Sequence, residues 1–222
     1  MWPRSRDVRT FSGFSNSGKT TLVNLISGLI QCDSGKILVD GKNTKDINKI
    51  DFQKKIGYIT QEPVIFNDSI FNNITFWAEK NEENLKRFNY AIQKASLLDT
   101  IDKMPLKEES LLGNNGINLS GGQKQRISIA RELYKDVEIL IMDEATSALD
   151  YETEKSIQEN IEALKGEYTM LTVAHRLSTI RSADTIILME NGKIIEAGSF
   201  SRVMEKQPNF KRMVESQNTF KN

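Results

Sequence analysis

The amino-acid sequence predicts an α/β fold with a mainly parallel sheet and helices packed on its faces. Short apolar runs rich in β-branched residues alternate with segments of helical periodicity, which is the pattern of folds built from strand–helix–strand units. Several of these runs also end directly in polar residues. Parallel strands bring such residues to one edge of a sheet, where α/β folds place their ligand sites.

Five apolar runs are interpreted as buried strands because they are too short for helices. They are KILVD at 36–40, IGYI at 56–59, EILIM at 138–142, MLTVA at 170–174 and TIILM at 185–189. Gln61 follows the second run, Asp143 and Glu144 follow the third, and His175 follows the fourth. This placement at strand ends is what a nucleotide site needs.

Between about 76 and 135 the pattern becomes helical. Leu85, Phe88, Ile92 and Ala95 fall at helical spacing and strand-like runs are absent, so a helical insertion is predicted. The chain is therefore divided into an atypical start (1–12), a first core part (13–75), this helical subdomain (76–135), and a second core part with C-terminal helices (136–222).

Near the C-terminus, Asn191-Gly192 is a strong two-residue hairpin signal between a strand and KIIEAG at 193–198. One or two short amphipathic helices are expected after it. The other end of the chain is anomalous. The residues before Gly13 are MWPRSRDVRTFS, with three arginines, whereas a strand that leads into such a fold is normally apolar throughout. Either that strand is weak or this beginning is not native.

Composition excludes several classes of protein. Of 222 residues, 38% are hydrophobic, and 30 Lys and Arg balance 30 Asp and Glu, so a disordered acidic tail and a strongly basic nucleic-acid binder do not fit. The single cysteine, Cys32, makes no internal disulfide, and a secretory signal is not found, which predicts a reducing, cytosolic setting. The longest apolar stretches are about four residues, whereas a membrane span takes about twenty. The N-x-[ST] matches at Asn67, Asn73 and Asn118 are read as chance.

A glycine-rich segment near the start matches the phosphate-loop pattern G-x4-G-K-[ST]. It comprises Gly13, Phe14, Ser15, Asn16, Ser17, Gly18, Lys19 and Thr20, and Thr21 follows; Leu22, Val23, Leu25, Ile26 and Leu29 continue it as a predicted helix. Glycines let backbone N–H groups point inward at phosphate oxygens, and the helix directs its positive end at the same anion. Lys19 would reach the β- and γ-phosphates and Thr20 would ligate Mg²⁺.

Two further segments carry chemistry. Asp143 suits the Mg²⁺ shell and Glu144 suits accepting a proton from attacking water, although an acid after an apolar strand is common. LSGGQ at 119–123 heads a helix that includes Ile127, Ala130 and Leu133. Ser120 is a plausible N-cap and the two glycines expose backbone N–H groups, which makes a second anion-binding helix start. Read alone, it is only a capped helix.

Together these motifs resemble the ATP-binding cassette family from about Gly13 to about Phe210. The resemblance implies a RecA-like P-loop NTPase core interrupted by a helical subdomain, with ATP and Mg²⁺ as cofactors. It also implies a head-to-tail dimer. There, Ser120, Gly121, Gly122 and Gln123 of one cassette cap the ATP held by the phosphate loop of the other.

The same resemblance assigns further residues. Gln61 is similar to the family's Q-loop glutamine, which touches Mg²⁺ and water and senses the membrane partner. The stretch Ser147-Ala148-Leu149-Asp150 is similar to the D-loop, with Asp150 near the nucleotide. His175 is similar to the switch histidine on the γ-phosphate. Considered alone, a lone histidine after an apolar strand more often has a structural role.

Two departures from the family pattern stand out. Asn16 replaces the usual third glycine, but asparagine tolerates positive φ, so the loop is expected to survive with some strain. Only twelve residues precede Gly13, so the family's adenine-stacking aromatic has no counterpart, and Trp2 is too close to serve. The sheet is expected to lack its first partners and to expose an edge. A truncated reading frame or an excised fragment would explain this start.

The leading functional prediction is the ATPase of a membrane exporter, because segments 115–134 and 172–198 look like the exporter branch. Its expected partners are a second cassette and a transmembrane domain at the cytoplasmic side of the membrane, with no nucleic acid. Three alternatives remain: a soluble cassette ATPase, a damaged cassette that binds nucleotide weakly, and a GTPase. The last is prompted by Asn48-Lys49-Ile50-Asp51, which spells NKxD, but this stretch does not follow an apolar strand and is interpreted as coincidence.

Overall fold

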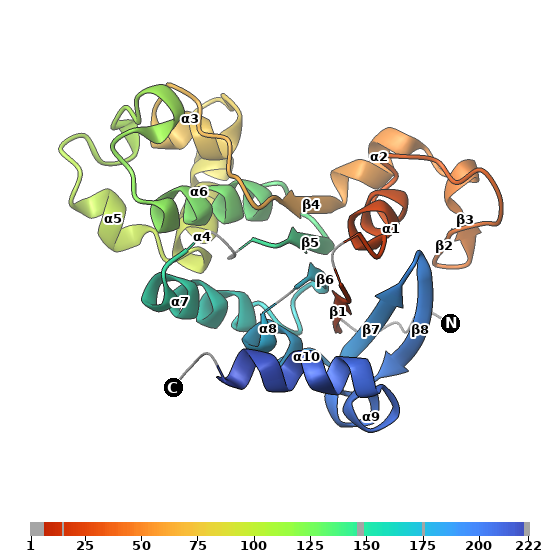
Figure 1. Cartoon of the computed structure of the whole chain (residues 1–222). Coiled ribbons are helices and arrows are strands. Elements are labelled where there is room, and N and C mark those ends of the chain that lie inside the picture. The colour runs from red at the N-terminus through yellow and green to blue at the C-terminus, as the bar shows by residue number, and fades with distance from the viewer. Residues whose placement is uncertain (1–6, 15, 146–148, 175, 220–222) are drawn as a thin grey trace. The chain divides into compact units, whose positions relative to one another are not determined.

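A six-stranded, mainly parallel sheet forms the main structure and confirms the predicted α/β class. The computed structural model describes residues 7–14, 16–145, 149–174 and 176–219. The strand order is β4-β5-β6-β1-β7-β8 (Figure 1). The bounds are β1 Val8–Ser12, β4 Ile56–Ile59, β5 Ile139–Asp143, β6 Thr169–Val173, β7 Thr185–Glu190 and β8 Lys193–Gly198. Four of the five predicted strands are therefore found close to their expected positions.

Helices make up most of the rest of the described chain. They are α1 Lys19–Ile26, α2 Lys49–Lys54, α3 Ile70–Thr75, α4 Glu82–Lys94, α5 Leu98–Asp102, α6 Gly121–Tyr134, α7 Tyr151–Glu162, α8 Leu177–Arg181, α9 Phe200–Lys206 and α10 Pro208–Thr219, with short 3-10 turns at Thr44–Asp46, Lys107–Glu109 and Asn114–Gly116. The chain divides into two compact units. The first unit comprises residues 1–56, 141–144 and 165–222, and the second comprises 57–140 and 145–164.

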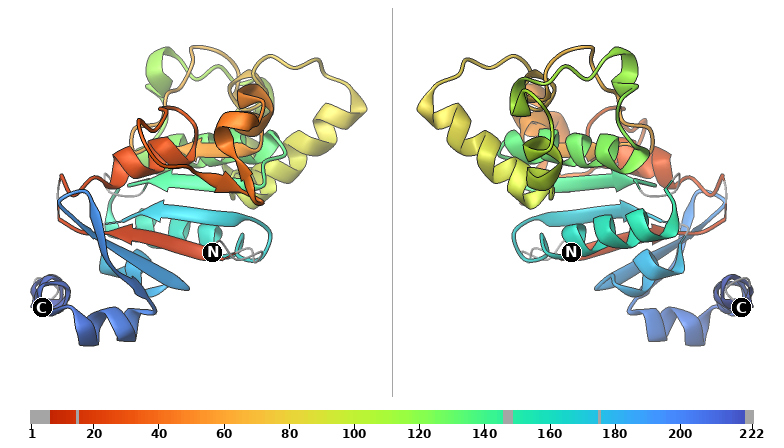
Figure 2. Two further views of the ribbon diagram at one scale, coloured as in Figure 1. Left: turned by 90° about the vertical axis from the view of Figure 1, so that its right-hand side faces the viewer. Right: turned by 90° about the vertical axis from the view of Figure 1, so that its left-hand side faces the viewer.

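Strand β1 lies inside the sheet despite its arginine and hydroxyl side chains. It pairs in parallel with β6 through Val8↔Met170 to Phe11↔Val173, and in parallel with β7 on its other side. Figure 2 shows β1 and β6 as neighbouring arrows, in red and cyan. Val8 and Phe11 are buried. The segment thus forms a strand that is paired on both sides despite its polar side chains.

The predicted buried strand at 36–40 is also wrong. Leu38–Val39 (β2) pairs only with Lys42–Asn43 (β3), as a separate two-stranded antiparallel hairpin. Leu38 is 47% exposed. Asp40 and Gly41 both have positive φ, 48° and 79°, as a two-residue type I′ turn requires. The Asp-Gly turn signal therefore determines the local structure, and the apolar run does not.

Helix α1 ends earlier than its apolar pattern predicts. Gly28 has φ 70°, and its N–H donates to the Leu25 carbonyl while that of Leu29 donates to the Asn24 carbonyl. These two bonds make a Schellman motif, which terminates a helix at a left-handed glycine. Leu29 consequently lies outside the helix and is 55% exposed, which corrects the prediction that it continues the helix.

The end of the first unit follows the sequence prediction. Asn191 and Gly192, at φ 49° and 75°, form the turn between β7 and the antiparallel β8. Helices α9 and α10 follow and pack on a core formed by Ala174, Ile180, Ile186, Leu188, Val203, Phe210 and Val214. β8 is the last strand in the order, and its Ile194 and Ile195 are 57% and 39% exposed, so an exposed edge is present.

The second unit contains the predicted helical stretch. Between residues 76 and 135, all of which are described, there are helices and one isolated bridge but no strand. Phe88 and Ile92 of α4 are buried together with Ala95, as their spacing predicts. The Phe88 ring lies 5.1 Å from that of Phe71 on α3. Helix α6 contributes Ile127, Ala130 and Leu133 to the same interior.

Strand β1 carries two buried hydroxyl groups that find no hydrogen-bond partner within the described ranges, Thr10 Oγ1 and Ser12 Oγ. Thr10 is fully buried. A buried polar group without a partner destabilises the fold, so we expect Thr10→Val to raise the free energy of unfolding by about 1 kcal/mol. Urea unfolding followed by circular dichroism measures this.

Thr75→Val is the matched control, because the buried Thr75 hydroxyl donates to the Phe71 carbonyl at 2.9 Å. The same exchange there removes a satisfied bond and is expected to leave stability unchanged or lower. Equal losses for the two variants would contradict the assignment of Thr10 as an uncompensated group.

Candidate functional site

The loop after β1 has a conformation that its glycines make possible. Gly13 has φ 148°, and a Cβ there would lie 2.2 Å from the carbonyl oxygen of Met189, so no side chain fits. Gly18 has φ 94° and is the N-cap of α1. Asn16 has φ 62°, a left-handed conformation that asparagine is expected to tolerate. The backbone is thus curled ahead of a helix N-terminus.

Lys19 turns back into this loop. Its Nζ donates to the Gly13 carbonyl at 3.1 Å, to the Phe14 carbonyl at 2.9 Å and to Ser17 Oγ at 3.2 Å. The side chain is 5% exposed. Burial lowers the pKa of Lys19, while the nearby charges of Glu144 and Asp143 oppose that shift. The structure therefore brings the two predicted carboxylates into the electrostatic environment of the loop lysine.

The turn between β7 and β8 contacts the phosphate loop and forms a hydrogen bond with it. The Gly192 N–H donates to the Ser17 carbonyl at 3.0 Å, and a Cβ on Gly18 would lie 3.4 Å from the Gly192 Cα. Ser17 is buried. This contact was not predicted. The sequence contains a signal for the hairpin turn, but no pattern in it indicates which segment that turn touches.

The first turn of α1 suits an anion accompanied by a small cation. Thr20 and Thr21 are exposed, and the turn carries no acidic residue, so the positive end of the helix is not neutralised. Thr20 and Asp143 offer hard oxygen donors. Within the described residues, no three His, Cys, Asp or Glu side chains gather as a metal cage. Mg²⁺ needs only one or two such protein ligands when phosphates and water supply the rest, so the donor set fits it.

Glu144 has an unusual backbone conformation. It follows β5 with φ 50°, a region that non-glycine residues enter at a cost of about 1–3 kcal/mol. Its N–H donates to the Val173 carbonyl at the end of β6, at 3.1 Å. This bond fixes the direction in which the chain leaves β5, at the strand end where the sequence predicts the general base.

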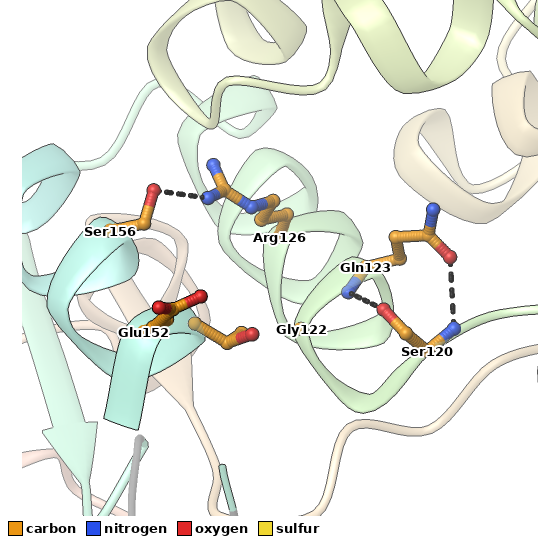
Figure 3. Close-up of a pocket in the computed structure, with 7 residues that line it drawn as sticks. Ser120, Gly122, Gln123, Arg126, Glu152 and Ser156 are labelled. Carbon is orange, nitrogen blue, oxygen red and sulfur yellow. Dashed lines mark hydrogen bonds between the residues drawn. The ribbon is translucent and has the colours of Figure 1, made fainter. Parts of the chain in front are cut away.

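In the second unit, helix α6 begins with a capping box. Ser120 Oγ accepts from the Gln123 N–H at 3.3 Å, and the Ser120 N–H donates to Gln123 Oε1 at 2.9 Å (Figure 3). The predicted N-cap is confirmed. Because this box fixes the first turn of the helix, the exposed Ser120 and Gly121 are held in a defined conformation.

Helix α7 begins beside this point. A Cβ on Gly122 would lie 2.3 Å from Thr153 Cγ2, so the glycine is what lets the two helices approach. Asp150 caps α7 by accepting the Thr153 N–H at 3.0 Å, and its hydrogen bonds with Thr153 lower the pKa of Asp150. The two helix starts border a pocket of about 310 Å³, lined by Ser120, Gly122, Gln123, Arg126, Glu152, Thr153 and Ser156 (Figure 3).

Gln61 lies in a short turn directly after β4 and is exposed. The Thr60 hydroxyl donates to the Glu62 carbonyl at 2.9 Å and closes this turn. On the other side, the buried Gln125 of α6 donates from Nε2 to the Thr60 carbonyl at 3.3 Å. The glutamine is thus presented on a turn that is fastened to α6.

The predicted site residues fall into two groups. The phosphate loop, Asp143 and Glu144 belong to the first unit, and Gln61, Ser120–Gln123 and Asp150 belong to the second. Predictions for Trp2, Ser15, Ser147, Ala148 and His175 lie outside the described residues.

The NKxD stretch has a structural explanation. Asn48 Oδ1 accepts the N–H groups of Ile50 and Asp51, at 2.9 and 3.2 Å, and so caps α2. The side chain that would read a guanine base is therefore engaged in its own helix. In the part of the chain that the structure describes, no helix combines the length and the apolar character of a membrane span.

Comparison with known proteins gives a consistent result. A family model described as ABC transporter matches residues 5–147. An ATP-dependent lipid A-core flippase of Ralstonia nicotianae is 42% identical over 204 residues, which cover 91% of this chain and 34% of that protein. A protein of the same name from Paraburkholderia xenovorans is 45% identical over 198 residues, covering 89% and 33%.

A solved structure described as a bacterial Atm1-family ABC exporter with ATP bound superposes with a TM-score of 0.85 at 32% identity, over 96% of this chain and 37% of that one. The chain spans about a third of the length of the relatives that it matches.

The close approach of α6 and α7 at Gly122 can be tested. We expect Gly122→Ala to lower the melting temperature, because the new Cβ would overlap Thr153 Cγ2. Adding Thr153→Ser, which removes that methyl group and keeps the hydroxyl, is expected to restore most of the loss. Thermal unfolding of the three variants measures both effects.

Gly121→Ala is the control, because the nearest atom to a Cβ there is Leu149 Cδ2 at 3.3 Å and alanine favours helix by about 1 kcal/mol. A loss at Gly122→Ala that Thr153→Ser does not relieve would mean that the overlap is not its cause.

Proposed function

Since the chain belongs to the ABC transporter family, as a cassette homologous to exporter ATPases, we propose that it binds Mg-ATP and hydrolyses it to drive a membrane exporter. The observation that carries the proposal is the phosphate loop. Lys19 is held inside a curled backbone between Gly13 and Gly18, and Asp143 and Glu144 act on its charge.

The phosphate loop binds the triphosphate in this proposal. The backbone N–H groups at the start of α1 and the Lys19 ammonium attract the β- and γ-phosphates. Thr20 and Asp143 would hold Mg²⁺, with Gln61 as a further oxygen donor. When bound, the ion neutralises charge that develops on the phosphates.

Glu144 acts as the general base. It takes a proton from the water that attacks the γ-phosphate, and it is suited to this role because it follows Asp143 at the end of a buried strand. The bond from its N–H to the Val173 carbonyl supports this role, since a fixed backbone limits where the carboxylate can reach. His175 is proposed as a contact to the γ-phosphate.

A second copy of the cassette completes each site. Ser120, Gly121, Gly122 and Gln123 of one copy approach the nucleotide of the other, with Asp150 nearby. The capping box at Ser120 supports this role, because a preformed helix start binds an anion without first having to order itself. ATP binding would close this dimer, and a transmembrane partner would receive that movement at the cytoplasmic side of the membrane. This chain covers about a third of the relatives' length, and a transmembrane domain would be consistent with the remainder.

Two measurements on the 222-residue chain test the proposal. Mg-ATP is expected to raise the melting temperature, because a ligand selective for the native state stabilises it, and GTP is expected to do so less. Phosphate release from Mg-ATP is expected to stop when EDTA removes the metal. If Mg-ATP binds but phosphate is not released, the chain is a nucleotide-binding cassette and the proposed ATPase activity is rejected.

The base is tested by Glu144→Gln. We expect steady-state phosphate release to fall by about 10²-fold or more, because a general base commonly contributes that much. The rise in melting temperature with Mg-ATP should persist, since Lys19 and the loop are unchanged. Glu205→Gln, on the exposed surface of α9, is the control. Unchanged turnover in Glu144→Gln would show that another group accepts the proton.

A further inference from the structure

Helix α6 holds the segment around Gln61 through buried polar side chains. Gln125, Arg131 and Glu132 are 1%, 6% and 6% exposed. Glu132 Oε2 accepts the Tyr58 N–H at 3.1 Å and Gln125 Nε2 donates to the Thr60 carbonyl at 3.3 Å. Arg131 Nη1 donates to the Val64 carbonyl at 2.8 Å. The chain is thus bound to α6 before and after Gln61.

Arg131 also reaches the middle of α3. Its Nε donates to the Asn73 carbonyl at 2.7 Å and its Nη2 to Asn73 Oδ1 at 3.3 Å. Asn73 is fully buried, accepts the Phe66 N–H at 2.8 Å and donates to the Phe66 carbonyl at 3.0 Å. The guanidinium therefore binds Val64 and Asn73 directly, and Asn73 in turn binds Phe66, so all three are joined to a single helix.

The surroundings of Arg131 make this junction costly to break. Its guanidinium carbon lies 5.2 Å and 5.4 Å from the ring centroids of Phe66 and Phe76, so carbonyl oxygens and aromatic faces replace its water. Displacing the segment would leave a buried charge and buried carbonyls without partners, at several kcal/mol in general. The 58–66 segment and α6 are consequently expected to move as one body.

We propose that Arg131, assisted by Gln125, is a positioning residue that fixes Gln61 relative to the Ser120–Gln123 end of α6. The helix transmits the constraint over about 15 Å, at about 1.5 Å per residue from Gly121 to Arg131. A displacement at Gln61 then moves the Ser120–Gln123 end of the helix, and a displacement of that end moves Gln61. The catalytic part of this proposal rests on the proposed function.

Arg131→Lys is the principal test. Lysine keeps the charge, but its single ammonium group cannot span the Val64 and Asn73 carbonyls as the planar guanidinium does. We expect kcat for Mg-ATP to fall by about 10- to 100-fold, as a small misplacement of a catalytic group does. KM and the rise in melting temperature with Mg-ATP should stay unchanged, because the phosphate loop is intact.

A double-mutant cycle separates positioning from general destabilisation. In a Gln61→Ala background, Arg131→Lys should lower kcat no further, since there is no glutamine side chain left to position. An equal loss of kcat in both backgrounds would overturn the proposal. Gln125→Met, which removes one hydrogen bond, should show the same pattern more weakly and serves if Arg131→Lys does not fold.

Arg87→Lys is the matched control. Arg87 lies on α4 and is half-buried. It donates to the carbonyl of Tyr134, the last residue of α6, at 2.6 Å, and its guanidinium carbon lies 4.8 Å from the Tyr134 ring centroid. Among the described residues, its hydrogen bond and ring contact do not involve the segment around Gln61, so kcat should remain within about twofold of the parent. A loss of kcat as large as that of Arg131→Lys would assign both effects to weakened α6 packing.

Native-state hydrogen exchange tests the junction without ATP turnover. In the parent chain, amides of 58–66 and α6 should open with a common free energy. Arg131→Lys should separate the two segments and Arg87→Lys should not. Different free energies in the parent, or a common one in Arg131→Lys, would reject the junction itself. If Arg131→Lys separates the opening free energies of the two segments but the parent chain does not hydrolyse ATP, the junction is supported and only the ATPase proposal is rejected.

Discussion

The pairing of β1 with strands on both sides is the constraint on which the candidate site depends. It sets where the chain leaves the sheet at Ser12 and therefore where Gly13 must pass the Met189 carbonyl. Neither Thr10 nor Ser12 contributes a satisfied side-chain hydrogen bond there, so the strand is held by its backbone ladder and by Val8 and Phe11. A polar-rich strand can occupy this place because the ladder hydrogen bonds are made by backbone N–H and C=O groups.

Local features of the structure follow closely from local sequence. The Ser120 capping box, the Asn191-Gly192 turn and the positive φ of Asn16 each depend on a few adjacent residues, so motif and turn chemistry predict them. The errors at 36–40 and at Leu29 have the same origin, because there a turn or stop signal competes with an apolar pattern. Asp40-Gly41 and Gly28 determine the outcome through backbone conformation, which hydrophobic periodicity does not report.

Contacts between distant segments could not be predicted in this way. The bond from Gly192 to Ser17 and the network from Arg131 to Asn73 join residues far apart in the chain. Periodicity indicates which face of an element is buried but not which partner covers it. No pattern in the sequence indicates that polar residues of α6 are buried, and the structure places Gln125 and Arg131 in the interior.

At position 144 the backbone conformation favours a different type of residue from the one that the proposed chemistry requires. At φ 50°, glycine or asparagine would occupy this backbone with less conformational penalty than glutamate. Glutamate therefore occupies this position at a conformational cost. We therefore expect glycine at this position to lower the conformational cost of the folded backbone while removing the carboxylate that we propose as the general base.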